Sequence, residues 1–208
     1  MPKTDYQYKF AFLFDQLTPL YDLVRVLGIR NRLQQRLWPL INIKTGSRVL
    51  DVGCGTGDDL VYLATHFDRL NLTGVDGDPK VLAIAKNKSK KRGLAVKFRA
   101  SLAEALPFTS NSFDVAWSSL MVHHLPTKYK LLALQEMRRV LKPGGQLYLV
   151  EFGQISRWLR WLYWWQIRLE PVGDHFTGKL PGYIRQAGFK QLIETGLLFH
   201  VFLFQARK

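Results

Sequence analysis

The sequence from Arg48 onward alternates short runs of β-type residues with longer stretches of helical periodicity. This alternation is typical of a mostly parallel sheet covered by helices on both faces, and it predicts an α/β fold. The expected strands lie at 49–52, 70–75, 95–99, 113–117, 146–152, 189–193 and 198–204. The expected helices between them lie at 58–66, 79–92, 127–141 and 179–187. We therefore expect one sheet of seven strands.

The composition narrows the class of protein. A chain of 208 residues, 47% of them hydrophobic, suits one domain with a sizeable core. Its single cysteine, Cys54, excludes an internal disulfide and a cysteine-rich zinc site, so no metal is expected, and it fits a reducing compartment. The first residues lack the apolar core of a signal peptide, and no uncharged apolar run reaches about 18 residues. The sequence therefore predicts a cytoplasmic protein.

The charge of the chain is strongly basic but unevenly distributed. Lys and Arg number 30 against 16 Asp and Glu, a net charge of +14, which favours acidic partners such as nucleic acid or anionic lipid. Residues 49–80, however, carry six acidic groups and two basic ones, a net charge of −4. A cationic ligand therefore suits this segment better than a phosphate.

The acidic segment begins with a strand that breaks into a glycine-rich turn, VLDVGCGTGD at residues 49–58, and then enters a helix. Such turns hold nucleotides, and a dinucleotide would require the spacing Gly-x-Gly-x-x-Gly. Counted from Gly53, the third position is Asp58, and counted from Gly55 it is Leu60. Acidic residues at the helix N-terminus would also repel a pyrophosphate. The turn therefore predicts a nucleoside ligand without phosphate.

Asp76 lies at the end of the next expected strand, 19 residues after Gly57. A carboxylate at this position can accept hydrogen bonds from the two hydroxyls of a ribose. The acidic flanks of the turn favour a positive charge on the same ligand. S-adenosylmethionine is a positively charged nucleoside without phosphate, and we therefore predict it as the cofactor, with S-adenosylhomocysteine as its product.

Five motifs, in order, resemble those of the class I S-adenosylmethionine-dependent methyltransferases. They are VLDVGCGTG (49–57), TGVDGDP (73–79), AEALPFTSNSFD (103–114), WSSLMVHHL (117–125) and RVLKPGG (139–145). The chain looks most like the small-molecule branch that includes ubiquinone/menaquinone C-methyltransferases and bacterial phospholipid N-methyltransferases. Their early FD…YD element resembles Phe14-Asp15 through Tyr21-Asp22. The resemblance implies a Rossmann-like sheet with an antiparallel last strand and an N-terminal helical cap.

The single domain, residues 1–208, then divides into four parts. Residues 1–47 are expected to form the helical cap or lid, 48–152 the cofactor-binding core, 153–180 a substrate-side insertion and 181–208 the C-terminal strands. Substrate identity is expected to depend on the first and third parts, where the core motifs give way.

The resemblance also implies which residues bind the methionine and ribose of the cofactor. It places the methionine end over Gly53, Gly55 and Gly57 and the ribose on Asp76. Asp51 either steadies the turn or binds the ammonium group.

The adenine, by the same resemblance, lies between Gly77 and the segment Leu102–Ala103, while Ser118 faces the methionine. One position departs from the pattern. Many relatives have Asp where this chain has Leu102, and that Asp accepts the adenine amino group. Either backbone contacts alone hold the adenine here, or Glu104 substitutes for the missing carboxylate.

Three residues are candidates for catalysis. Methyl transfer to a phenol, a quinol or an acidic carbon requires a base, whereas an amine needs only desolvation. His175 is the better-placed base, because it lies in the variable segment after the fifth strand. His123 is a second candidate, weighed against a role in capping and packing the next loop. Tyr21 either closes over the sulfonium or packs within the lid.

Residues 155–169 have the pattern of a basic amphipathic helix. One face is apolar, with Trp158, Trp161 and Trp165, and the opposite face carries Arg157, Arg160 and Arg168. Such a helix suits a membrane interface. The alternative is a lid whose tryptophans line a large apolar pocket. Both interpretations favour a hydrophobic substrate, and the first adds peripheral membrane contact.

The sequence therefore predicts a methyltransferase that acts on a small, hydrophobic or lipid-like acceptor, quinone-like or phospholipid-like. A nucleic-acid methyltransferase is one alternative, but the Asn/Asp-Pro-Pro-Tyr/Phe motif of amino-directed base methylases is missing, since the fourth strand ends in Trp117-Ser118-Ser119-Leu120. Nucleic acid is therefore not the expected partner. A module that binds cofactor or a partner without catalysis is the other alternative.

Overall fold

The structure is a computed structural model that describes residues 29–156, 158, 161 and 173–208. The chain forms two compact units, residues 1–41 and residues 42–208. Within the first unit, helix α3 spans Ile29–Leu37 and is followed by the 3₁₀ turn η1, Trp38–Leu40. Proline at position 39 accounts for the end of α3, because its ring cannot continue an α-helix. The rest of the expected cap, including Tyr21, lies outside the described residues.

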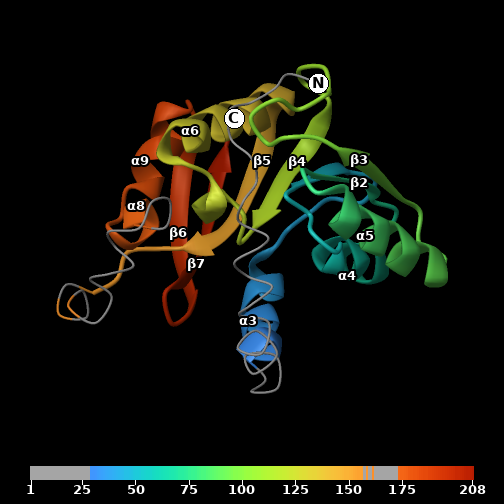
Figure 1. The fold of residues 1–208 in the computed structure, drawn as a ribbon, viewed down its shortest axis with the longest axis horizontal. Helices are drawn as coiled ribbons and strands as arrows, with labels where there is room; N and C mark the ends of the chain where they lie inside the picture. Colours follow the sequence, from blue (N-terminus) through green and yellow to red (C-terminus); the bar gives the residue numbers. More distant parts are fainter. Residues whose placement is uncertain (1–28, 157, 159–160, 162–172) are drawn as a thin grey trace. The chain divides into compact units, whose positions relative to one another are not determined.

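The second unit is built on a sheet of seven strands in the order β3-β2-β1-β4-β5-β7-β6 (Figure 1). Strands β1 to β5 run parallel, and β7 runs antiparallel to both of its neighbours, β5 and β6. The prediction of a seven-stranded, mostly parallel sheet with an antiparallel last strand is thus confirmed. The bounds of the strands are β1 Arg48–Val52, β2 Asn71–Asp76, β3 Val96–Ala100, β4 Phe113–Ser119, β5 Leu141–Phe152, β6 Lys190–Leu198 and β7 Val201–Arg207.

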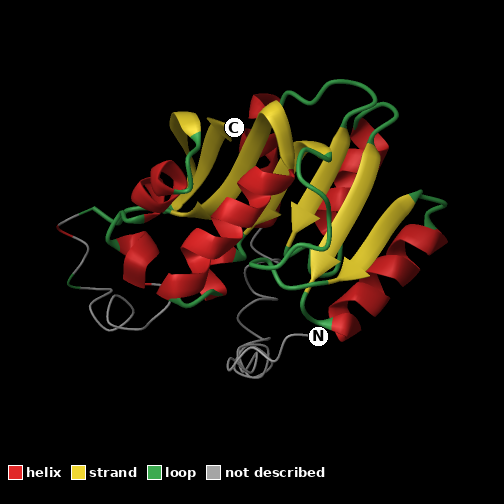
Figure 2. Cartoon of the chain, turned by 90° about the horizontal axis from the view of Figure 1, so that it is seen from above, coloured by secondary structure: helices red, strands yellow, loops and turns green. Residues whose placement is uncertain are grey.

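Helices lie on both sides of the strands, as Figure 2 shows from above. Because crossovers between parallel strands are right-handed, α4 and α5 lie on one face, and α6, which connects strands running the other way along the sheet, lies on the opposite face. Helix α9 packs against α6. The bounds of the remaining elements are α4 Asp58–His66, α5 Pro79–Lys91, η2 Val122–His124, α6 Thr127–Val140, α8 Gly173–Phe176 and α9 Leu180–Gln186.

The buried core follows from the central position of β1, β4 and β5. Val49, Leu50 and Val52 have no exposed surface, because strands covered on both faces are apolar throughout. Edge strand β3 instead exposes most of its residues. The strand order changes direction between β1 and β4, and in open α/β sheets ligands bind outside the carboxyl ends of the strands at such a point. The predicted site residues must be sought at that carboxyl edge of the sheet.

The C-terminal hairpin differs from the prediction in its turn. We expected strands at 189–193 and 198–204, whereas β6 extends to Leu198 and the turn falls at Phe199 and His200. Phe199 adopts a φ of 50°, a conformation that large side chains rarely take. The turn contains neither Gly nor Asn, and this explains why sequence rules for hairpins miss it.

The expected amphipathic helix at 155–169 lies mostly outside the described residues. Ile155 is buried, whereas Trp158 and Trp161 are 73% and 71% exposed. The three arginines of the expected polar face are not among the described residues. Within the part of the chain that is described, we find no helix with the length and apolar character needed to cross a membrane.

Candidate functional site

The glycine turn between β1 and α4 adopts a backbone that only glycine takes without strain. The φ angles of Gly53, Gly55 and Gly57 are 76°, 51° and 77°. Two successive amides, those of Gly53 and Cys54, donate to the carbonyl of Val75 at 2.8 and 3.0 Å, and they tie the turn to the end of β2. The turn therefore has a fixed position against the neighbouring strand.

The surroundings of the three glycines differ. A Cβ at Gly57 would lie 3.1 Å from the Cβ of Ala85, so this glycine allows α5 to pack closely. A Cβ at Gly53 would overlap with Met121, whose Cγ would be 2.2 Å away. A Cβ at Gly55 would meet nothing within 4 Å. The backbone at Gly55 thus borders open space, and a ligand can approach it.

Asp76, at the end of β2, is fixed by backbone donors. Its Oδ2 accepts the N–H of Gly55 and its Oδ1 accepts the N–H of Asp78, both at 2.9 Å. Burial raises the pKa of Asp76, although these backbone hydrogen bonds oppose the shift. A carboxylate has about four lone-pair positions, so the carboxylate of Asp76 keeps acceptor capacity for a hydroxyl of a ligand. Asp76 is therefore oriented beside the open side of the turn.

Two further carboxylates make this edge of the sheet strongly negative. Asp51 is 2% exposed, and its burial, together with repulsion from Asp59 and Asp76, raises its pKa well above the usual range. Asp59 accepts a hydrogen bond from the indole N–H of Trp117 at 3.0 Å. A cation bound here would relieve the repulsion among the three carboxylates. The charge of Asp58, in contrast, is offset by Lys88, whose Nζ lies 2.6 Å from its Oδ1.

Leu102 and Ala103 lie in a turn that is anchored to the end of β2. The N–H of Ser101 donates to the carbonyl of Asp76 at 3.0 Å, and the N–H of Ala105 donates to the carbonyl of Leu102 at 3.2 Å. The side chain of Glu104 projects from this turn. Its Oε2 is buried without a hydrogen-bond partner in the described part of the chain, and burial raises the pKa of its carboxyl. A ligand with an amino group would satisfy this oxygen.

Ser118 requires a correction. We expected it to face the methionine of the cofactor, but its hydroxyl donates to the carbonyl of Val52 at 2.7 Å and the residue has no exposed surface. The hydroxyl joins β4 to β1 inside the sheet. This geometry gives Ser118 a structural bond and does not support the predicted cofactor contact.

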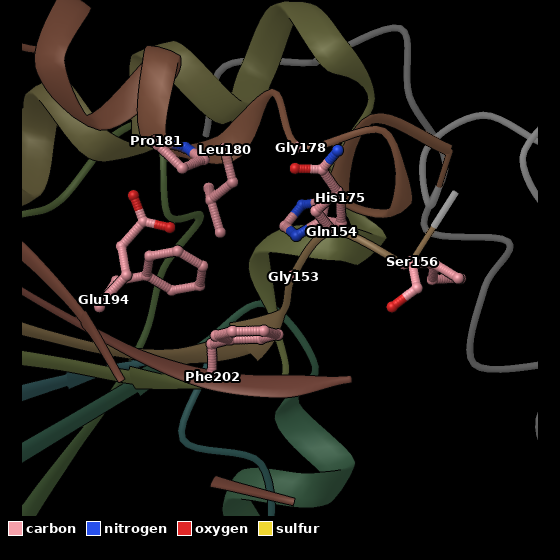
Figure 3. Close-up of a pocket in the computed structure, with 11 residues that line it drawn as sticks. Gly153, Gln154, Ser156, His175, Gly178, Leu180, Pro181, Glu194 and Phe202 are labelled. Atoms are coloured by element: carbon pink, nitrogen blue, oxygen red, sulfur yellow. The ribbon is translucent and has the colours of Figure 1, made fainter. Parts of the chain in front are cut away.

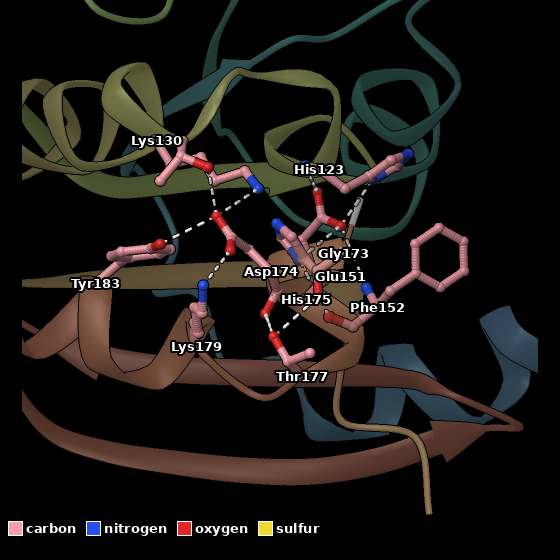
Figure 4. A network of polar contacts seen from close by, with 11 residues as sticks. His123, Lys130, Glu151, Phe152, Gly173, Asp174, His175, Thr177, Lys179 and Tyr183 are labelled. Carbon is pink, nitrogen blue, oxygen red and sulfur yellow. Dashed lines mark hydrogen bonds and ion pairs between the residues drawn. The ribbon is translucent and has the colours of Figure 1, made fainter. Parts of the chain in front are cut away.

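His123 forms a buried pair with Glu151, which lies near the end of β5 (Figure 4). The Nδ1 of His123 is 2.8 Å from Oε2 of Glu151, and the backbone N–H of His123 donates to Oε1 at 3.3 Å. Burial acts to raise the pKa of Glu151, but the hydrogen bonds of His123, and the positive charges that protonated His123 and His175 bring in acid, outweigh it and lower the pKa to about 2. Glu151 is therefore ionised, and the ring of His123 donates from Nδ1.

His175 lies on the other side of the same carboxylate. Its Nδ1 is 3.8 Å from Oε2 of Glu151 and 3.2 Å from the carbonyl oxygen of Phe152. The rings of His123 and His175 meet edge to face, with centroids 6.1 Å apart. Burial lowers the pKa of His175 to about 4, so the ring is neutral at pH 7. The structure thus brings the two histidines predicted from the sequence together on one glutamate.

Asp174 holds the segment that carries His175. Its carboxylate accepts hydrogen bonds from Thr127 at 2.6 Å, Lys179 at 2.8 Å and Tyr183 at 3.0 Å, and buried Lys130 lies 3.5 Å away (Figure 4). Burial opposes ionisation, but these donors lower the pKa of Asp174 below its usual range. The network fixes α8 and α9 against the start of α6.

A cavity of about 330 Å³ lies beyond His175, between the end of β5, α9 and strands β6 and β7 (Figure 3). Its walls include Ile155, Leu180, Phe202 and Phe204. None of the residues of the glycine turn lines it. The cavity is therefore a different place from the open side of the turn.

Sequence reasoning missed Glu151 and the partners of Asp174. The sequence does carry a signal for Glu151, because it is an acidic residue that directly follows the apolar run Leu147–Val150 of a buried strand. Lys130 gives no comparable signal, since a lysine in an amphipathic helix is normally exposed.

The fold and the site define the class of protein. The family model described as a methyltransferase domain matches residues 49–145. An uncharacterized methyltransferase of Synechocystis is 30% identical over 88% of this chain and 84% of that relative. The chain therefore belongs to the S-adenosylmethionine-dependent methyltransferases.

Two further relatives carry more specific names. A demethylmenaquinone methyltransferase of Thermus thermophilus is 36% identical, with 67% of this chain and 64% of that protein aligned. A ubiquinone/menaquinone biosynthesis C-methyltransferase of Bdellovibrio bacteriovorus is 33% identical, with 69% of this chain and 62% of that protein aligned. The chain thus spans somewhat less than two thirds of the length of these two relatives.

Solved structures share the fold. A SAM-dependent methyltransferase from Aquifex aeolicus superposes with a TM-score of 0.68 at 22% identity, covering 89% of this chain and 97% of that one. A protein from Pyrococcus horikoshii gives a TM-score of 0.71 at 21% identity, covering 89% of this chain and 98% of that one.

Proposed function

We propose that this chain transfers a methyl group from S-adenosylmethionine to a small apolar acceptor of the quinone type, in its reduced, hydroxylated form. Family membership and the names of the quinone-pathway relatives support this proposal. The observation that carries it is the His123–Glu151 pair, a histidine oriented by an ionised carboxylate. This histidine lies two residues after Met121, which packs against the glycine turn.

The residues at the carboxyl edge fit the family's cofactor. Asp76 would hold the ribose hydroxyls, the turn at Gly55 would border the methionine, and Asp51 would stabilise the positive charge. The unpartnered oxygen of Glu104 would accept the adenine amino group in place of the carboxylate missing at Leu102. When bound, the cofactor supplies a methyl group on a positively charged sulfur.

His123 would act as the general base. Its Nδ1–H donates to Glu151, so Nε2 carries the free lone pair and is the atom that takes a proton. The nearby carboxylate stabilises the imidazolium that forms, as in other carboxylate–histidine pairs. Proton removal from a hydroxyl raises electron density on the acceptor ring and prepares its oxygen or carbon for methylation. A reaction on an amine would not require this pair.

The test is transfer of labelled methyl from S-adenosylmethionine to 1,4-naphthohydroquinone, with a phosphatidylethanolamine dispersion and tRNA as competing acceptors. We expect label in the hydroquinone, and we expect His123→Gln and Glu151→Gln to lower kcat about 10²-fold or more. His66→Gln, which changes an exposed histidine on α4, should retain full activity. Label in tRNA or in the lipid alone would contradict the proposal.

Membrane contact through residues 155–169 is a finer part of the proposal. The exposure of Trp158 and Trp161 supports it, because indole rings favour the membrane interface. We expect the chain to co-sediment with anionic vesicles at low salt, and Trp158→Ala with Trp161→Ala to weaken this binding. If the wild-type chain fails to bind even at low salt, the interpretation of 155–169 as a lid is favoured instead.

A further inference from the structure

The cavity beyond His175 is bounded on opposite sides by Leu180 of α9 and the ring of Phe202 of β7 (Figure 3). The ring of Phe202 packs on the backbone of Gly153, where a Cβ would come within 2.4 Å of it. The volume of the cavity, about 330 Å³, is within the range of small-molecule sites, about 300–1,000 Å³. It has room for a ligand of one or two rings.

One of the polar groups that line this cavity is the histidine His175, and one of its ring nitrogens makes no hydrogen bond among the described residues. His175 has no exposed surface, and its Nε2 has no hydrogen-bond partner among the residues that the structure describes. Buried polar atoms are nearly always satisfied, so an orphaned one in a cavity wall indicates a partner that binds there. Gln154, which is exposed, places its amide at the same end of the cavity (Figure 3).

The hydrogen bonds of the ring determine what that partner must be. Nδ1 faces two acceptors, the carbonyl oxygen of Phe152 at 3.2 Å and the carboxylate of Glu151 at 3.8 Å, so Nδ1 carries the proton. The ring holds only one proton, because burial lowers its pKa to about 4. Nε2 is therefore an acceptor, and it is satisfied by a hydroxyl or an N–H and not by a carbonyl.

The charges of the described residues around the cavity favour an uncharged ligand over an anion. Glu194 is part of the lining, and no Lys or Arg is among the lining residues that the structure describes. An anion would be repelled by this carboxylate, and Arg185, whose guanidinium is 4.0 Å from Glu194, lies outside the lining. Apart from Gln154, Ser156 and His175, the remaining lining side chains are aliphatic or aromatic.

From these observations we infer that the cavity is a second ligand site, which binds an uncharged apolar ring bearing a hydroxyl group and seats that hydroxyl on Nε2 of His175. This inference does not rest on the proposed methyl transfer. The lining of the cavity includes no residue of the glycine turn, and neither Glu151 nor His123 is part of it.

The experiment compares two probes on the full chain by calorimetry. 1-Naphthol carries a hydroxyl donor, and 1-methoxynaphthalene has the same rings without one. We expect 1-naphthol to bind about threefold to tenfold more tightly than 1-methoxynaphthalene, because one hydrogen bond changes affinity by about this factor. His175→Phe should bind both probes equally, whereas His66→Phe should retain the preference. Equal binding of the two probes by the wild-type chain would overturn the inference.

A second variant tests whether the two probes bind in the cavity, and it changes an exposed residue and not one of the core. Gln154→Trp places a large ring at an exposed position beside the cavity and should weaken both probes about tenfold or more. Unchanged affinity for both probes in this variant would mean that they bind elsewhere and would also overturn the inference. Asp76→Ala, which the proposed function expects to lose S-adenosylmethionine, should bind both probes as the wild type does. The two proposals can therefore fail separately.

Discussion

Two regions at the carboxyl edge of the sheet bury acidic groups in opposite ways. Around the glycine turn, burial and repulsion from neighbouring carboxylates raise the pKa values of Asp51 and Asp76, with no cation among the described residues that act on them. Around α8, the pKa values of Glu151 and Asp174 are lowered by histidines, lysines and hydroxyls that surround them. In the second region, side chains of the chain itself stabilise the ionised carboxylates, whereas in the described part of the first region the groups that lower the pKa of Asp76 are backbone N–H groups. We propose that uncompensated negative charge marks the binding site and that compensated charge marks the groups that hold side chains in position.

The largest effect is expected on stability in the compensated region. Asp174→Ala removes three hydrogen bonds and leaves Lys130, which has no exposed surface, without its carboxylate. We expect a loss of about 3–5 kcal/mol in the free energy of unfolding, measured by urea denaturation. Glu194→Ala is the matched control, since its contact with Arg185 is exposed and 4.0 Å long, and it should cost less than about 1 kcal/mol. A small effect of Asp174→Ala would mean that the network does not hold α8.

The next effect is expected on binding in the uncompensated region. Asp76→Ala should weaken S-adenosylmethionine by about 1.5–3 kcal/mol, because its charge-assisted hydrogen bonding to the ribose is lost. Loss of the bonds from the N–H groups of Gly55 and Asp78 should at the same time lower the free energy of unfolding, a cost that the removal of a buried carboxylate partly offsets. Asp68→Ala, at an exposed position, controls for the change of net charge. Unchanged affinity in Asp76→Ala would refute the ribose assignment.

The last expected effect is a dependence of stability on pH, which builds up gradually over several pH units. Burial lowers the pKa values of His175 and His124 from 6.5 to about 4, so the unfolded chain takes up protons that the folded chain does not. The free energy of unfolding should therefore fall as pH falls from about 6.5 to 4, by up to about 1.4 kcal/mol per pH unit for each ring. Because the pKa of Glu151 is lowered in the folded chain, the free energy of unfolding should fall further as pH falls from about 4.5 to 2. His175→Phe should reduce the slope between pH 6.5 and 4, and His66→Phe should not. Equal slopes in both variants would contradict the account.

The uncompensated region, which is the glycine turn with Asp51 and Asp76, could be predicted from the sequence because its residues lie close together along the chain. The glycines, Asp51 and Asp76 lie within two strands and one turn, and positive φ angles and strand ends leave a recognisable spacing. The strand count follows equally from alternation of apolar runs. The antiparallel direction of β7 was implied only by the resemblance to the family.

The compensated region could not be predicted in the same way, because its contacts join distant parts of the chain. Glu151 meets His123 across 28 residues, and Thr127 meets Asp174 across 47. The hydroxyl of Ser118 donates to the carbonyl of Val52, and this partner depends on the register of β4 against β1. No sequence motif indicates that register. Similarly, the pairing of Lys88 with Asp58 depends on how α5 packs beside α4.

We propose that the uncompensated acidic edge selects a cationic nucleoside. The most direct test of this proposal is calorimetry of the wild-type chain with S-adenosylmethionine and with NAD, at several salt concentrations. The account predicts that S-adenosylmethionine binds, that added salt weakens this binding, and that NAD gives no heat at the concentrations that saturate the chain with S-adenosylmethionine. Tight binding of NAD, or equal binding of the two, would contradict it.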